Sequence, residues 1–142
     1  MDITTGLYNK LKDDGTLVAL LASYPSGSPD GGAIFTAWPV PPDAERPYVY
    51  TRGDVAVTHF DEIHTNLGLD VIRDIFVVDD NTGSELAVEA IARRIRTLLH
   101  RQPLTIPDGS HIMTQCIGQT VAETDDSLTG RVLTFRIVAM ES

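Results

Sequence analysis

The sequence predicts an α+β fold: a single domain, residues 1–142, in which an antiparallel or mixed β-sheet carries two main helices on one face. Two stretches, one at the N-terminus and one between Gly83 and Pro103, place apolar residues at helical spacing. Most other apolar stretches alternate or are rich in β-branched and aromatic residues, as strands are. Because each apolar stripe needs a partner layer, helices packed on one side of a sheet satisfy both patterns.

The N-terminal segment, Asp2–Ala22, is expected to form a helix, a kink and a second short helix. Apolar residues recur at helical spacing from Ile3 to Leu11 and give one apolar face. The turn-forming run Asp13-Asp14-Gly15 then interrupts the helix. We expect Thr16 to cap the second helix, because a threonine oxygen can accept from the free backbone N–H groups of the first turn.

Glycine and proline divide the next part of the chain into loops and two short strands. Residues 24–32 are dense in Gly, Pro and Ser and should form an exposed loop. Ala33–Ala37 and Tyr48–Arg52 are the expected strands. The proline-rich stretch 38–47 between them should cross in an extended, polyproline-like conformation, because its prolines fix φ and remove backbone donors.

Residues 53–66 are polar and lack a clean period, and we interpret them as a projecting loop or hairpin tip. Loops of this length within a compact domain are usually functional or disordered. From Leu67 to Val78 the pattern is that of a strand, with alternating residues on two faces. A bulge is expected near Arg73-Asp74, where the apolar run begins.

The clearest helical pattern follows the turn Asp79–Gly83 and stops before Pro103. Thr82 and Glu85 have capping-box spacing, with Ser84 as the alternative cap. The core-facing stripe is expected to be Ala87 or Val88, Ile91, Ile95, and Leu98 or Leu99.

The C-terminal part is expected to add three strands. Leu104–Ile106 should be a short edge strand, followed by long strands over Ile112–Glu123 and Arg131–Met140. In the second long strand, Leu133, Phe135, Ile137 and Ala139 alternate with Val132, Thr134, Arg136 and Val138, as in a sheet with one better-buried face. Residues 125–130 link the two long strands as a hairpin loop.

The composition favours a soluble protein made in a cytoplasm. Nothing at the N-terminus resembles a signal peptide, and the apolar runs are far shorter than the ~20 residues of a membrane span. Eleven basic against twenty acidic side chains give a formal charge of −9. This balance argues against sequence-specific DNA binding, which concentrates basic residues. It is compatible with a channel through which DNA slides without sticking, because like charges repel.

A search for catalytic or ligand-binding chemistry predicts no catalytic, cofactor-binding or metal-binding residues. In the cluster His59-x-Asp61-Glu62-x-His64 the two histidines are five apart, which fits neither a helix face nor one side of a strand. A plain solvated loop is favoured over a metal site. Cys116 falls in a strand pattern, where cysteine usually acts as a small buried hydrophobe. The phosphate-cradling and dinucleotide motifs are absent from the sequence.

Trp38, the single tryptophan, lies beside prolines and has two interpretations of equal weight. It can cover the edge of the core as a lid. Alternatively, it can anchor a subunit contact, because tryptophan is enriched at binding hot spots.

An ordered set of short motifs covers nearly the whole chain and resembles the tail-terminator, or tail-completion, family of long-tailed phages. Gene-transfer agents and defective prophages use similar proteins. The motifs are Leu7-Tyr8, Leu11, Asp14-Gly15, Leu17-Val18-Ala19-Leu20-Leu21, Ile34-Phe35, Pro42, Ala44, Pro47-Tyr48-Val49, Asp74-Ile75-Phe76-Val77, Ala90-Ile91-Ala92, Ile95-Arg96, Leu98-Leu99 and Gly130-Arg131-Val132-Leu133-Thr134-Phe135-Arg136-Ile137.

The resemblance implies a structural virion protein of the tail's neck region that uses no cofactor and is not an enzyme. Such proteins form a ring, typically of six copies, which caps the tail tube and presents a surface to the head connector. The implied partners are therefore further copies of the chain, the major tail tube protein and the head–tail connector protein. DNA would pass through the lumen without specific binding, and assembly would take place in the host cytoplasm.

In the family, a loop or hairpin commonly reaches from the sheet towards the tube or a neighbouring subunit. Residues 53–66 are the region that could play this part, with His59, Phe60 and His64 as candidate contact residues. Trp38 and Arg52 are further candidates for the subunit or tail-tube interface.

Two other functions stay open at this point. The chain could be a different neck or head–tail connector component, with another partner. From another class, it could be a small enzyme or ligand-binding domain that uses the His59–His64 loop, which would require those histidines to share a pocket with an acid.

Overall fold

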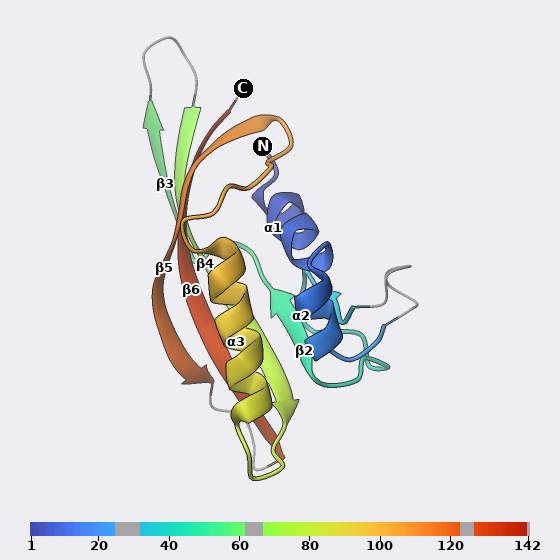
Figure 1. Cartoon of the computed structure of the whole chain (residues 1–142). Coiled ribbons are helices and arrows are strands. Elements are labelled where there is room, and N and C mark those ends of the chain that lie inside the picture. The colour runs from blue at the N-terminus through green and yellow to red at the C-terminus, as the bar shows by residue number, and fades with distance from the viewer. Residues whose placement is uncertain (25–31, 62–66, 123–126, 142) are drawn as a thin grey trace.

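The computed structural model describes residues 1–24, 32–61, 67–122 and 127–141. It contains three helices and six strands, arranged as a helical layer on one face of a sheet (Figure 1). In chain order they are α1 (Ile3–Lys12), α2 (Gly15–Leu20), β1 (Ile34–Phe35), β2 (Tyr48–Thr51), β3 (Ala56–Asp61), β4 (Leu67–Asp80), α3 (Leu86–Leu99), β5 (Gly109–Ala122) and β6 (Leu128–Glu141).

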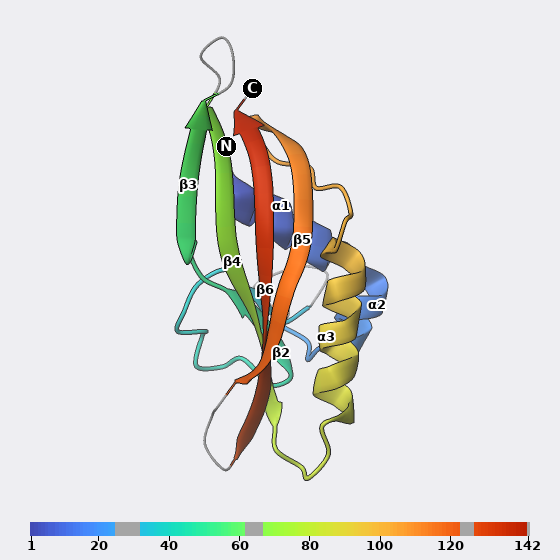
Figure 2. The same ribbon diagram turned by 90° about the vertical axis from the view of Figure 1, so that its left-hand side faces the viewer.

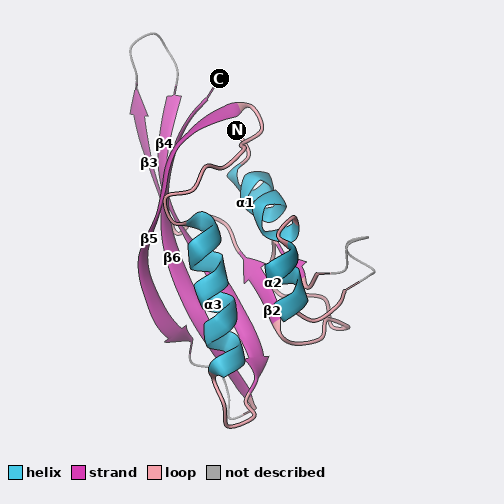
Figure 3. Cartoon of the chain, in the orientation of Figure 1, coloured by secondary structure: helices cyan, strands magenta, loops and turns pink. Residues whose placement is uncertain are grey.

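The sheet is mixed and is dominated by three long strands. Its order is β1-β2-β4-β6-β5, with β3 also paired to β4. Strands β1 and β2 are parallel, and every other pair is antiparallel. Strands β4, β5 and β6 each have 14 residues, whereas β1 has two (Figure 3). The predicted α+β class is confirmed.

All three helices cover the same face of the sheet, so the core lies on that face (Figures 1 and 2). Alternate residues of β4 and β6 point into it, because successive side chains of a strand face opposite ways. The fully buried side chains include Leu7, Leu11, Leu17, Val71, Ile75, Ile91, Ile95, Leu99, Leu133, Phe135 and Ile137. The predicted stripe of the long helix is thereby confirmed.

The N-terminal helices form as predicted, but the second begins earlier and has another cap. Asp14, not Thr16, caps α2: its carboxylate accepts from the backbone N–H of Leu17 at 2.8 Å. Asp14 is better placed because its backbone is extended and it directly precedes the first helical residue, Gly15. Arg94 on α3 donates to the same carboxylate from two nitrogens, at 2.9 and 2.7 Å, and so ties the short helix to the long one.

The predicted capping box of α3 is wrong. The helix starts at Leu86, and its N-cap residue Glu85 makes no side-chain capping bond. The Ser84 hydroxyl, the alternative cap, accepts from the Leu86 N–H at a long 3.4 Å. Glu85 instead reaches across to Arg131 on β6, which is a stronger partner than a backbone N–H.

Two strand predictions are also corrected. Leu104–Ile106 is not a strand; Leu104 and Ile106 bury their side chains in the core from an irregular segment. Strand β4 has no bulge at Arg73-Asp74, since its register with β6 runs unbroken from Gly68 to Asp80. The register shifts occur in β5, between His111 and Met113 and between Cys116 and Gly118.

Candidate interaction surfaces

The predicted contact residue Trp38 tops a stack of three aromatic rings. Its ring stacks on Tyr50 with centroids 4.8 Å apart, and Tyr50 stacks on Phe76 at 4.6 Å with the planes 4° from parallel. Tyr50 is buried, which raises the pKa of its phenol. Trp38 remains 49% exposed, so it covers the stack with one face and offers the other to solvent. Both interpretations made from the sequence are compatible with this position.

This stack belongs to a second, smaller apolar cluster around β1 and β2. Tyr24, Phe35 and Tyr48 extend it through edge-on ring contacts. Because Tyr48 and Tyr50 lie opposite Val78 and Phe76, these rings occupy the sheet face that the helices do not cover. The proline-rich stretch that brings Trp38 to Tyr50 therefore packs against the back of the sheet.

Arg52 follows β2 and is exposed. It lines a hollow of about 340 Å³ together with Gly53–Val55, Asp74 and Phe76. Both carboxylates of the hollow have partners: Asp54 accepts from Arg73, and Asp74 accepts from the Thr134 hydroxyl at 2.6 Å. The hollow thus carries little unsatisfied charge besides the Arg52 side chain.

His59 and Phe60 are neighbours on β3 and point to opposite faces. Phe60 lies against Gly68 on β4 so closely that a β-carbon at Gly68 would lie 2.2 Å from its ring. His59 is exposed on the other face, opposite Leu69. The third candidate of this region, His64, lies outside the described residues.

The candidates do not form one site. Trp38 sits at the level of Phe76 on β4, whereas His59 sits at the level of Leu69, seven residues away. At ~3.3 Å per residue, roughly 23 Å of strand separates the two levels. In the part of the chain that the structure describes, no group of three or more His, Cys, Asp or Glu side chains could hold a metal ion.

Sequence reasoning missed the most distinctive surface, the outer edge of β5. Its 14 residues, Gly109–Ala122, contain no Asp, Glu, Lys or Arg. Ile112, Ile117 and Val121 are exposed along it. Edge strands of natural proteins usually carry charges or prolines that discourage pairing with other chains. The uncharged run can be read in the sequence, but residues 15–29 also lack charged side chains, so the run alone does not single out this strand.

Part of that edge is already covered. The backbone N–H of Arg101 donates to the Thr114 carbonyl at 2.8 Å, and the Cys116 N–H donates to Nδ1 of His100 at 3.0 Å. These bonds come from the segment after α3 and occupy the middle of the strand. Burial lowers the pKa of the nearby His111, whose Nε2 lies 2.6 Å from the Thr114 hydroxyl.

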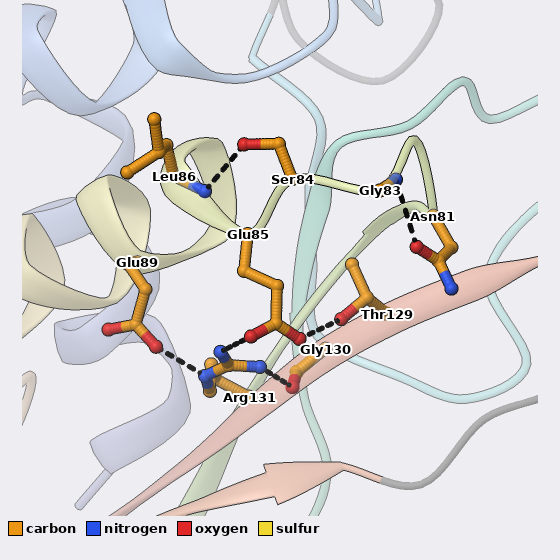
Figure 4. A network of polar contacts seen from close by, with 9 residues as sticks. All are labelled: Asn81, Gly83, Ser84, Glu85, Leu86, Glu89, Thr129, Gly130 and Arg131. Carbon is orange, nitrogen blue, oxygen red and sulfur yellow. Dashed lines mark hydrogen bonds and ion pairs between the residues drawn. The ribbon is translucent and has the colours of Figure 1, made fainter.

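The densest polar cluster has a structural role (Figure 4). Arg131 on β6 is buried; its Nε donates to Glu89 on α3 at 2.7 Å, and its Nη2 donates to Glu85, the N-cap residue of α3, at 2.9 Å. Its Nη1 donates to the carbonyl of Gly130 at 2.8 Å. The bond from Arg131 and one from the Thr129 hydroxyl hold the pKa of Glu85 below its usual value. Since the charges satisfy one another, the cluster fastens α3 to the sheet.

Three comparisons with known proteins bear on the fold. No family model matches the sequence, and no curated protein matches it. Among solved structures, the chain is similar to one described as "Virion of native gene transfer agent (GTA) particle", with a TM-score of 0.77 and 20% sequence identity. The match covers 98% of this chain and 95% of the other. At that identity the finding is a shared fold over essentially the whole length of both chains. The described residues contain no helix long and apolar enough to span a membrane.

Proposed function

We propose that this chain is a structural subunit of a phage-like particle that forms a ring closing the head-proximal end of the tail tube and joining it to the head connector. The observation that carries the proposal is the nearly full-length similarity of fold to a chain of a gene-transfer-agent virion. It agrees with the ordered resemblance of the sequence to tail terminators. The two lines use different features of the chain: one uses short sequence motifs and the other the path of the backbone.

Two exposed surfaces of the chain are suited to contacts with other protein chains. The half-exposed Trp38 and the uncharged edge of β5 are the kinds of surface that partner chains cover. The polar clusters of the described residues are closed ion pairs that connect elements, as Arg131 does with Glu85 and Glu89. The proposed partners are other copies of the chain, the tail tube protein and the connector protein. The charge of −9 suits a lumen that DNA crosses without binding.

The test is the mass of the purified protein by light scattering over a wide concentration range, with negative-stain images of the heaviest species. A closed ring of about six copies of the 15.5 kDa chain, with a central hole, is the expected result. If a tube is needed as template, the ring should appear when the protein is mixed with tail tubes. A protein that stays monomeric and does not bind tail tubes would refute the proposal.

A second candidate is another neck component, because the structural similarity is to a chain of a virion and leaves the position in the particle open. The two candidates differ in partner. A pull-down that compares tail-tube protein with portal-side proteins separates them: the terminator binds the tube end, and another connector component binds the portal side alone.

A further inference from the structure

The open part of the β5 edge can be located from the bonds that cover the rest. In an antiparallel strand, residues with outward-pointing backbone groups alternate with residues bonded to the neighbour. Thr114 and Cys116 point outward, since their groups bond to Arg101 and His100. The register shift after Cys116 inserts one extra residue, so Gln119 is the next outward residue. Among the described residues, no strand pairs with the outer backbone edge of segment 117–122, and Ile117 and Val121 are 49% and 62% exposed. The Gln119 side-chain oxygen accepts from Arg96 of α3 at 3.1 Å.

The same chain carries a second edge of low charge on the opposite side of the sheet. Strand β3 is paired to β4 on one side, and its one charged residue is Asp61, the last of the strand. Val55 and Val57 are 62% and 46% exposed. Like the 117–122 segment, β3 has six residues. The charged residues at the two edges, Asp61 on β3 and Arg96 beside Gln119, have opposite signs and would not repel each other. Both edges also expose valines, which favour strands.

The directions of the two edges also agree. Strands β3, β4, β6 and β5 are antiparallel in succession, so β3 and β5 run in opposite directions. When a second copy is placed beside the first by rotation about a common axis, its β3 meets β5 as an antiparallel partner. Such a contact joins two different patches of the subunit, as closure of a ring requires.

The axial offset of the edges matches the stagger of a closed sheet. The centre of β3 lies at the level of Leu69 and Asp70 on β4, and the centre of 117–122 lies about six residues further along, near Ile75 and Phe76. Six residues span roughly 20 Å along the strands. The four strands β3, β4, β6 and β5 of one copy span ~19 Å across the sheet, so the next copy would begin at that distance. The two lengths give a strand tilt of about 45°, the upper end of the ~35–45° found in closed barrels.

We propose that neighbouring copies in the assembly join edge to edge, with β3 of one copy pairing antiparallel with residues 117–122 of the next. This inference rests on the proposed function, because it names the contact by which the ring would close. Val57 and Val121 project from the same side of the sheet, as their opposite residues Val71, Arg131 and Val77 do. The joined sheet therefore brings the two valines together on the helix-bearing side and covers both.

Cross-linking tests the contact directly. In a Cys116→Ala background, the double variant Val57→Cys/Val121→Cys is treated with a short bismaleimide under the conditions in which the wild-type chain assembles. Two edges of one sheet are too far apart to be linked within a copy, so we expect a ladder of covalent species up to the full ring. Each single-cysteine variant should give dimers at most. A double variant that gives no more than the single ones overturns the inference.

Introduction of a charge at the edge supplies a second measurement. Val121→Lys should raise the concentration at which half of the protein is assembled by at least about tenfold, since a lysine on an edge strand opposes pairing. Leu20→Lys, on α2, is the matched control and should change it less than about twofold. Far-UV circular dichroism checks that both variants fold.

The outcomes separate the contact from the function. If Val121→Lys forms rings as readily as the wild type and the double-cysteine variant gives no ladder, the edge contact is wrong and the proposed function still stands. Failure of the wild-type chain to form rings or bind tubes defeats the proposed function. A ladder without closed rings supports the edge contact alone.

Discussion

The ion pair between Arg73 and Asp54 can be used to measure how much stability is lost when a buried charge loses its partner. Arg73 lies on β4 among core residues, and its side chain is 5% exposed. Its Nε and Nη2 both donate to Oδ1 of Asp54, at 2.9 and 2.6 Å, and Nη1 donates to the Thr4 hydroxyl at 2.6 Å. Asp54 precedes β3, so the pair also fixes where that strand begins.

Removing the acid should cost more than removing the base. Asp54→Ala leaves a buried guanidinium with one described side-chain partner, Thr4. Breaking a buried pair in this way costs about 3–5 kcal/mol. Since the Asp54 side chain is 25% exposed, water reaches this side of Arg73, and we expect the lower end, about 3 kcal/mol. Arg73→Met removes the buried charge and leaves a carboxylate that water can solvate, so we expect a loss of about 1 kcal/mol.

Urea unfolding at neutral pH measures these losses. In the double variant Asp54→Ala/Arg73→Met the loss should be close to that of Arg73→Met alone, so that the two changes are coupled by roughly 2–3 kcal/mol. Asp70→Ala is the control, because its partner Arg136 is 43% exposed and stays hydrated when the acid is removed; its effect should be much smaller. A loss for Asp54→Ala no greater than for Arg73→Met or Asp70→Ala would refute this account of the pair.

Three further outcomes are expected. Gly130→Ala should lose about 1–3 kcal/mol of unfolding free energy, because its β-carbon would lie 2.6 Å from a backbone carbonyl, while Gly118→Ala, with open space around it, should change it by less than about 0.5 kcal/mol. The bond from Arg94 lowers the pKa of Asp14, so the stabilisation that Asp14 gives is present above pH ~4 and is lost as the pH falls through the lowered pKa. The urea midpoints of the wild type and Asp14→Asn should therefore differ at pH 7 and converge as the pH is lowered and the Asp14 carboxyl of the folded protein becomes protonated. If Trp38 anchors a subunit contact, its fluorescence should shift to shorter wavelength on assembly; an unchanged spectrum would favour the lid.

Elements that carry their own pattern could be predicted from the sequence. The stripe of α3 from Val88 to Leu99 and the alternation of β6 are properties of consecutive residues, and both appear as expected. Their patterns persist over three to four turns or fourteen residues, so tertiary packing reinforces the local preference instead of overriding it.

Features that depend on a distant partner could not be predicted. Glu85 has good capping chemistry, but Arg131, forty-six residues later, engages its carboxylate. Strand β3 has no clean period because its side chains are mostly exposed on both faces, and pairing with β4 defines it. The bulges of β5 likewise exist only relative to β6, so no local signal places them.

The candidate contact residues were predicted from their residue type and their place in the sequence. Such a prediction names single residues and does not give their neighbours in the fold. It singled out Trp38, but the stack on Tyr50 and Phe76 needs a crossing segment to fold back on the sheet. The uncharged run of β5 was readable in the sequence. The run matters for assembly because β5 lies at the edge of the sheet, and that position cannot be read from the sequence.

Because the larger core cluster lies on one side of the sheet, alternate residues of β6 should differ in their tolerance to substitution. On β6, Leu133, Phe135 and Ile137 are fully buried beneath the helices, whereas the intervening Thr134 and Arg136 lie on the other side and are partly exposed. Tolerance to mutation along this strand should therefore oscillate with a period of two. Two chains of low sequence identity can share the same backbone path, as a TM-score of 0.77 at 20% identity illustrates.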